Sequence, residues 1–152
     1  MSGETRLRGI VFLALVGLFV ALYLLLYHLG FYGQLVCGTG SCDAVQTSKY
    51  ARLLGQPVPM WGTVWYAAVL TLAAIALGQL SGRTDAYRIA IRLLALCATV
   101  GLLFSLYLTA LELFVIHAVC LWCVVSAVLT LVIFLLCEPW RTLRGEGIAR
   151  AS

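Results

Sequence analysis

The chain has 152 residues, of which 63% are hydrophobic and only 11% are charged, and its mean hydropathy is +1.04. Soluble globular domains average roughly 45–50% apolar and about 25% charged residues. The composition therefore excludes an ordinary soluble domain and indicates an all-α integral membrane protein. The net charge of +4 is too thinly spread along the chain to indicate nucleic-acid binding.

Four apolar stretches predict four transmembrane helices within a single domain that covers residues 1–152. The predicted spans are 9–28, 61–80, 92–116 and 119–137, each near the roughly 20 residues that a bilayer core requires. A cleaved signal peptide is the competing interpretation of the first stretch. That stretch is longer than the roughly 7–15 residues of a signal core, and no Ala-x-Ala-like cleavage site follows it.

Residues 30–60 form the one long loop of the predicted bundle. The segment between Cys37 and Cys42 is rich in glycine, which permits unusual backbone angles. Asp43 is placed to cap a short helix, with Gln46 three residues later as in a capping box. This helix is expected to lie on the membrane surface or over the mouth of the bundle.

The distribution of basic residues predicts how the bundle is oriented. Eight of the ten Lys and Arg residues fall on one side, in the N-terminal segment, the turn after the second span and the tail at 141–152. Only Lys49 and Arg52 fall on the other side. The positive-inside rule then places both termini in the cytoplasm. The long loop and the turn around His117 are expected on the external face of the plasma membrane.

The six cysteines differ in their setting. Cys97 and Cys137 lie inside apolar runs, where a cysteine usually packs as a small hydrophobic residue. The other four form two close pairs, Cys37/Cys42 in the loop and Cys120/Cys123 at the start of the fourth span. Both pairs are predicted on the external side, which in bacteria is an oxidising compartment.

Two dithiols on that side suit a thiol–disulfide relay, which proceeds through mixed disulfides. Cys37 is the outward member of the loop pair and Cys42, beside the short helix, is the inner one. Cys120 faces the loop from a helix N-terminus, where the helix dipole favours the reactive thiolate. Cys123 lies about one turn deeper, so it is better placed to pass electrons to a molecule dissolved in the bilayer.

The cysteines could also form a zinc site, a haem attachment site or a structural disulfide. A zinc site of four cysteines fits poorly with the exported, lipid-edge setting, so no metal is predicted. A c-type haem needs a histidine directly after the second cysteine, and Val124 stands there. A permanent structural disulfide between Cys37 and Cys42 remains an open alternative for the loop pair.

Five further residues are candidates for binding a flat ring beside the cysteines. Trp61 and Trp65 share one helix face, although both also fit the aromatic belt of a membrane interface. Glu112 is a carboxylate near the end of an apolar run, which indicates either function or simple snorkelling. His117 either assists the Cys120 thiolate and proton transfer or only lies at the interface. Ile116 completes the set.

Three segments together resemble a known family. They are the loop from Cys37 to Tyr50, with Ser48 inside it, the stretch from Leu54 to Gly62, and the stretch from Glu112 to Cys123. They are similar to the vitamin K epoxide reductase family, and most closely to its bacterial members, which form disulfide bonds in exported proteins. The resemblance covers nearly the whole chain, from the first span to the fourth.

The resemblance implies a four-helix bundle that surrounds a quinone. It implies that Cys37 exchanges with a thioredoxin-like protein, that Cys42 and Cys120 form the shuttle disulfide and that Cys123 faces the quinone. Ser48 matches a family serine that assists the relay or its geometry. Some bacterial relatives carry a fused thioredoxin-like domain, and the chain ends before one, so a separate partner is expected.

Ala127 stands where vertebrate members of the family have a tyrosine that helps to hold vitamin K. A respiratory ubiquinone or menaquinone is therefore the expected ligand. The predicted function is a membrane thiol:quinone oxidoreductase. A vitamin K quinone or epoxide reductase that uses the same cysteines, and a non-enzymatic membrane scaffold with a structural loop disulfide, are the alternatives. The spacing of the cysteines does not set the direction of electron flow.

Overall fold

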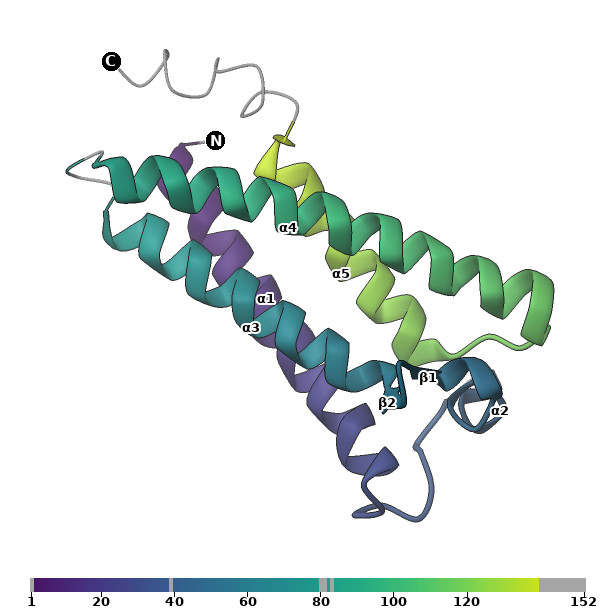
Figure 1. The fold of residues 1–152 in the computed structure, drawn as a ribbon. Coiled ribbons are helices and arrows are strands. Elements are labelled where there is room, and N and C mark those ends of the chain that lie inside the picture. The colour runs from purple at the N-terminus through teal and green to yellow at the C-terminus, as the bar shows by residue number, and fades with distance from the viewer. Residues whose placement is uncertain (1, 39, 80–81, 83, 140–152) are drawn as a thin grey trace.

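The computed structural model describes residues 2–38, 40–79, 82 and 84–139. Four helices form the bundle, and the smaller elements lie at one end of it (Figure 1). In chain order the elements are α1 (Gly3–His28), α2 (Cys42–Gln46), the 3₁₀ turn η1 (Lys49–Ala51), β1 (Arg52–Leu53), β2 (Gln56–Pro57), α3 (Val58–Gly78), α4 (Asp85–Ala110), the π-helical segment η2 (Leu111–Ile116) and α5 (Leu121–Cys137).

Three helices are long and apolar enough to cross a membrane: α1, α3 and the continuous Asp85–Ile116 segment made of α4 and η2. The fourth apolar helix, α5, has 17 residues, at the lower limit of the range for a spanning helix. Large apolar side chains also face outward, among them Phe12 and Phe19, each 65% exposed. The protein is therefore a mainly helical membrane protein, and the fourth crossing stays a prediction.

Each of the first three spanning helices begins earlier than the apolar pattern predicts. They start at Gly3, Val58 and Asp85, because backbone hydrogen bonding continues through polar residues until a cap ends it. The Thr84 hydroxyl accepts from the Tyr87 N–H at the start of α4. Sequence periodicity sees only the apolar part of such a helix.

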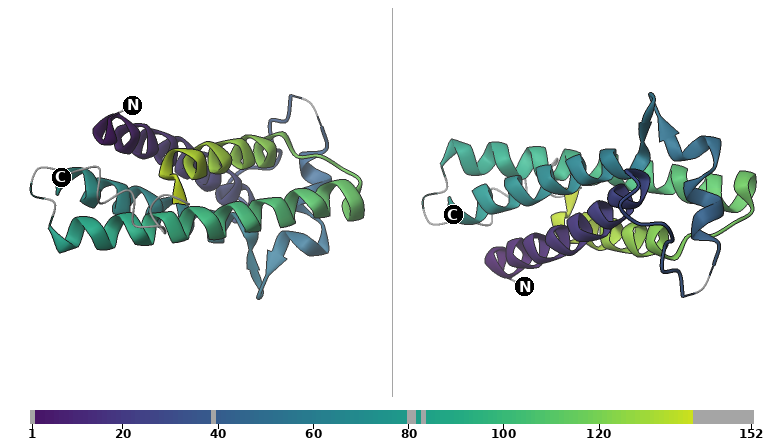
Figure 2. Two further views of the ribbon diagram at one scale, coloured as in Figure 1. Left: turned by 90° about the horizontal axis from the view of Figure 1, so that it is seen from above. Right: turned by 90° about the horizontal axis from the view of Figure 1, so that it is seen from below.

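The helices pack through small residues. α1 lies against α3 and α5, and α4 lies against the same two helices (Figure 2). The ring of Tyr66 packs directly against Gly17 of α1. A Cβ at Gly17 would lie 2.1 Å from the ring, so only glycine leaves enough room. Ala14 and Ala73 are fully buried nearby. Such close approach suits membrane helices, whose association depends on packing and polar contacts rather than on the hydrophobic effect.

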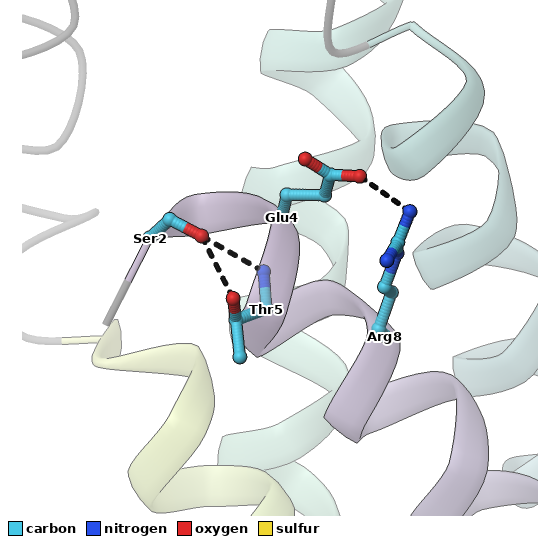
Figure 3. A network of polar contacts seen from close by, with 4 residues as sticks. All are labelled: Ser2, Glu4, Thr5 and Arg8. Carbon is cyan, nitrogen blue, oxygen red and sulfur yellow. Dashed lines mark hydrogen bonds and ion pairs between the residues drawn. The ribbon is translucent and has the colours of Figure 1, made fainter.

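The end of the bundle that holds the N-terminus is tied together by polar groups. Ser2 caps α1: its hydroxyl accepts from the Thr5 N–H at 3.2 Å, and Glu4 pairs with Arg8 at 2.6 Å (Figure 3). Arg6 of α1 forms an ion pair with Glu138, directly after α5. The described start and end of the chain therefore lie at the same end of the bundle. The predicted tail at 141–152 falls outside the described residues.

The long loop differs from the prediction in two details. Asp43 does not cap α2: Ser41 is at the N-cap position, and the Asp43 carboxylate accepts from the Tyr27 hydroxyl at 3.1 Å instead. The all-α class also admits one small exception, the antiparallel pair β1–β2. Its turn places Leu54 and Gly55 at positive φ, 53° and 82°, as a tight two-residue hairpin requires.

Candidate functional site

The loop cysteines form a disulfide, Cys37–Cys42, with their Cα atoms 6.2 Å apart. Cys42 is the first residue of α2 and is only 1% exposed, whereas Cys37 is half-buried. The more exposed residue is thus the one that the sequence predicts to face a partner. The buried residue is the predicted inner member.

A backbone bridge brings the second cysteine segment against this loop. After η2 the chain turns at His117 and runs extended to Cys120, which forms an isolated antiparallel bridge with Gly40. The Ser41 N–H donates to the Val119 carbonyl at 2.9 Å. Gly40 has φ +98°, and a Cβ there would lie 2.4 Å from the Val119 oxygen. Only glycine fits this position without strain.

The bridge places Cys42 and Cys120 in one buried cluster, which also contains Leu24, Leu35 and Val45. Cys120 has no exposed surface, and Cys37 and Cys123 pack at the edge of the cluster. The two cysteine pairs therefore lie together at one end of the bundle, as the charge count predicts. Cys120 and Cys123 are free thiols in this structure.

Buried polar groups surround the free pair. The Glu112 carboxylate, 5% exposed, accepts from the Cys120 N–H at 3.1 Å and hydrogen-bonds the Cys123 thiol. The Gln46 amide donates to Cys123 Sγ at 3.4 Å and to Cys120 Sγ at 3.8 Å. On its other side Gln46 Oε1 lies 2.8 Å from His28 Nε2.

The position of Glu112 depends on the π-helical turn. A π turn widens the helix and is often found at functional sites. Here it ends when the Ala118 N–H bonds the Glu112 carbonyl and His117 takes a left-handed conformation, φ 55°. Glu112 is thereby turned inward to the cysteines rather than outward, where the snorkelling interpretation would place it.

The Cys120 sulfur accepts a hydrogen bond from the Cys123 thiol, and the Gln46 amide donates to it as well. Hydrogen bonds to a sulfur favour its charged thiolate form. Burial and the nearby Glu112 carboxylate oppose this effect. A stabilised thiolate is a good leaving group in disulfide exchange.

Beside the free pair lies an apolar cavity of about 480 Å³, a volume usual for a small-molecule site. Aromatic residues of α3 form part of its wall, and Cys123, Gln46 and Glu112 stand at the wall as polar groups. Trp65 is seated against Gly101, where a Cβ would lie 2.2 Å from the indole, and its Nε1 donates to the Cys97 carbonyl at 2.9 Å. Trp61 also lines the cavity.

The remaining predicted residues lie elsewhere. Ile116 and Ser48 line a second cavity of about 40 Å³, which Glu112 and Cys123 share. The Ser48 hydroxyl donates to the Val45 carbonyl at 2.8 Å, so its visible contact stabilises the end of α2. His117 is exposed and lines neither cavity; the structure brings Glu112, rather than His117, to Cys120.

The structure also gives places to residues that the sequence left aside. Cys97 and Cys137 pack against the main apolar cluster, in agreement with the packing role predicted for them. The sequence predicts for Gln46 only a place in a capping box, and it gives no sign of the contact with the sulfurs. In the part of the chain that the structure describes, no group of three His, Cys, Asp or Glu residues is placed to hold a metal.

A family model for the vitamin K epoxide reductase family matches residues 9–137. The chain belongs to this family. The chain is therefore a membrane oxidoreductase that acts on thiols and quinones, as family membership implies. Its apolar helices and two cysteine pairs agree with this class. Members of the family use quinone-type electron carriers in general. A search of curated proteins found no match.

Proposed function

We propose that this family member is a membrane thiol:quinone oxidoreductase that generates disulfide bonds. In this proposal the loop pair oxidises a separate thioredoxin-like dithiol protein outside the cytoplasm, and the Cys120/Cys123 pair passes the electrons to a membrane quinone. One observation carries the proposal: Cys42 and Cys120 share a buried cluster, while Cys123 lines the large apolar cavity. The basic residues support a plasma-membrane orientation with cytoplasmic termini.

The outer exchange begins from the disulfide that the structure contains. A partner thiolate attacks Cys37 Sγ, the Cys37–Cys42 bond breaks, and Cys42 leaves as a thiolate. The partner's second thiol then attacks the partner's first sulfur in the mixed disulfide, and Cys37 leaves as a thiolate. The partner leaves with a disulfide, and the loop pair keeps two electrons and two protons as a dithiol.

The inner exchange requires a Cys120–Cys123 disulfide as the acceptor. Cys42 attacks Cys120 Sγ and Cys123 leaves as a thiolate; Cys37 then attacks Cys42 Sγ and Cys120 leaves. The loop disulfide is restored and the inner pair becomes a dithiol. An oxidised loop pair and an inner dithiol are the products of this exchange.

The cavity residues fit a quinone ring. The walls are apolar, Trp61 and Trp65 offer flat surfaces, and Cys123 stands at the wall. A quinone bound there accepts two electrons and two protons as it becomes a hydroquinone. Glu112 hydrogen-bonds the Cys123 thiol and is placed to take its proton as the Cys120–Cys123 bond forms.

The direct test is oxidation of a reduced thioredoxin-like dithiol protein by the purified chain, with ubiquinone or menaquinone added. We expect one quinone to be reduced for each disulfide formed. Alkylation trapping follows the same reaction: a relay changes its thiol population with partner and with quinone, whereas a scaffold with a structural disulfide responds to neither.

A variant assigns the two pairs. Cys123→Ser should abolish quinone reduction and still form a mixed disulfide between Cys37 and the partner, because the loop disulfide is intact. Cys137→Ser, which lies outside both pairs, should reduce quinone like the unaltered protein. Unimpaired quinone reduction by Cys123→Ser would overturn the assignment of roles.

A further inference from the structure

The Gln46 side chain joins three elements at the centre of the site. Its Oε1 meets His28 Nε2 at the end of α1, at 2.8 Å, and its Nε2 meets the sulfurs of Cys123 and Cys120, at 3.4 and 3.8 Å. The residue itself is the last of α2 and is 6% exposed. Both ends of a buried amide therefore have partners, and two of these partners are the sulfurs of the inner pair.

Burying an amide costs free energy unless its hydrogen bonds are made. An apolar residue at this buried position would avoid that cost. We propose that Gln46 is a positioning residue for the relay: its N–H groups stabilise the thiolate on each inner sulfur in turn. The order of the steps rests on the proposed function; the contacts do not.

The exchange steps explain why one amide meets two sulfurs. Cys123 leaves as a thiolate when Cys42 attacks Cys120, and Cys120 leaves as a thiolate when Cys37 attacks Cys42. A lower-energy thiolate leaves faster, and a hydrogen bond to a charged acceptor is stronger than one to a neutral acceptor. The amide carries two N–H donors, so it serves both leaving groups without moving far.

When its Nε2 carries the proton, His28 favours the orientation of the amide in which the N–H groups face the sulfurs. The oxygen and nitrogen of an amide are alike in shape, so the hydrogen bonds decide the orientation. A histidine Nε2 that carries a proton donates to Gln46 Oε1, and the N–H groups are then directed to the sulfurs. The reversed amide would place its oxygen against a thiolate, where like charges repel.

The same contacts fix the position of Cys42 relative to Cys120. Cys42 and Gln46 are four residues apart and lie one above the other on one face of α2. Fixing the amide against the inner sulfurs and His28 therefore holds Cys42 beside Cys120, in the buried cluster they share. A single side chain thus links the thiolate chemistry to the docking of the loop.

Two variants and a matched control test the proposal in the full-length protein. Gln46→Met keeps the length of the side chain and removes the donor; Gln46→Glu keeps the shape and replaces the donor with an acceptor. Gln56→Glu makes the same change at an exposed glutamine of β2 that lines neither cavity. The first measurement is the ultraviolet thiolate absorbance of the reduced protein as a function of pH. The absorbance of the same protein carrying Cys120→Ser is subtracted, so that the difference reports Cys120 alone.

We expect the Cys120 midpoint to move up by about one pH unit in Gln46→Met and further in Gln46→Glu, since one unit corresponds to a tenfold change in thiolate stability. It should stay unchanged in Gln56→Glu. The second measurement, the rate of dithiol-dependent quinone reduction, should fall about tenfold in Gln46→Met, with little change in KM for the quinone.

The absorbance measurement separates this proposal from the proposed function. If the unaltered protein reduces no quinone, the proposed function fails, and the thiolate midpoints still decide the role of Gln46. Unchanged midpoints in both Gln46 variants would overturn the proposal, even when quinone reduction is intact. Gln46→Glu guards against loss of packing, because glutamate has the size of glutamine but puts a carboxyl group in place of the N–H donors.

Discussion

Cys120 experiences opposing influences on its thiol. It has no exposed surface, and burial alone would favour the neutral thiol. The hydrogen bond from Cys123, the Gln46 amide and the N-terminus of α5 favour the thiolate. These contacts give a buried cysteine the hydrogen bonds that favour a thiolate in disulfide exchange.

The same contacts predict how oxidation of the inner pair depends on pH. The rate should rise with pH, because the thiolate is the reactive form of a cysteine. Single-turnover oxidation of the pre-reduced protein by quinone, without a partner, measures this. A rate that falls as pH rises would contradict the assignment.

Among the structural elements, the bridge between Gly40 and Cys120 determines whether the loop can dock. The bridge, the Ser41–Val119 hydrogen bond and the close approach of the Gly40 backbone together join segments that lie about eighty residues apart in the sequence. They hold the loop without any covalent link to α5. The docked position can therefore be left and regained while the disulfides exchange.

Gly40→Ala should weaken this docking, because its Cβ would meet the Val119 oxygen and alanine is strained at φ +98°. Strain of this kind costs about 1–3 kcal/mol, which is roughly a fivefold or larger loss of the docked state. The measurement is the yield of the Cys42–Cys120 disulfide in a Cys37→Ser/Cys123→Ser background.

Gly38→Ala is the matched control, since Gly38 lies in the same loop with no atom near its Cβ position and an ordinary φ. Its yield should equal that of the parent background. An equal yield in Gly40→Ala would show that the bridge does not govern the approach of the two cysteines.

The helices could be predicted because apolar runs report burial in lipid directly. The positions of α1, α3 and the Asp85–Ile116 helix and the grouping of the cysteine pairs follow from composition, charge and spacing. The π turn at Glu112 and the contact of Gln46 with Cys120 could not be predicted. Both depend on packing between segments distant in the sequence, and no local pattern encodes which buried partner a glutamine will meet.

Taken whole, the molecule has two differently built ends. One end is closed by the Arg6–Glu138 ion pair and carries most of the basic residues that the structure describes. The other holds the cysteines, the loop and the cavity, with Lys49 and Arg52 exposed on it. This polarity supports the proposed function, in which electrons enter from one side of the membrane.

The orientation can be tested with Lys49, the sole lysine of the sequence. In intact cells a membrane-impermeant amine reagent should label Lys49, whereas an N-terminal epitope tag should become accessible only after permeabilisation. Lys49→Arg supplies the control for labelling elsewhere. Labelling of Lys49 that requires permeabilisation would reverse the predicted topology.

The shortness of α5 has a consequence for the bilayer beside it. Its 17 residues span about 26 Å, whereas the hydrocarbon core of a bilayer is roughly 30 Å thick. The neighbouring Asp85–Ile116 helix has 32 residues, and the chain returns from its end as an extended segment before α5 begins (Figure 1). In the proposed four-span arrangement α5 is therefore shorter than the hydrocarbon core, and the bilayer is expected to thin beside it.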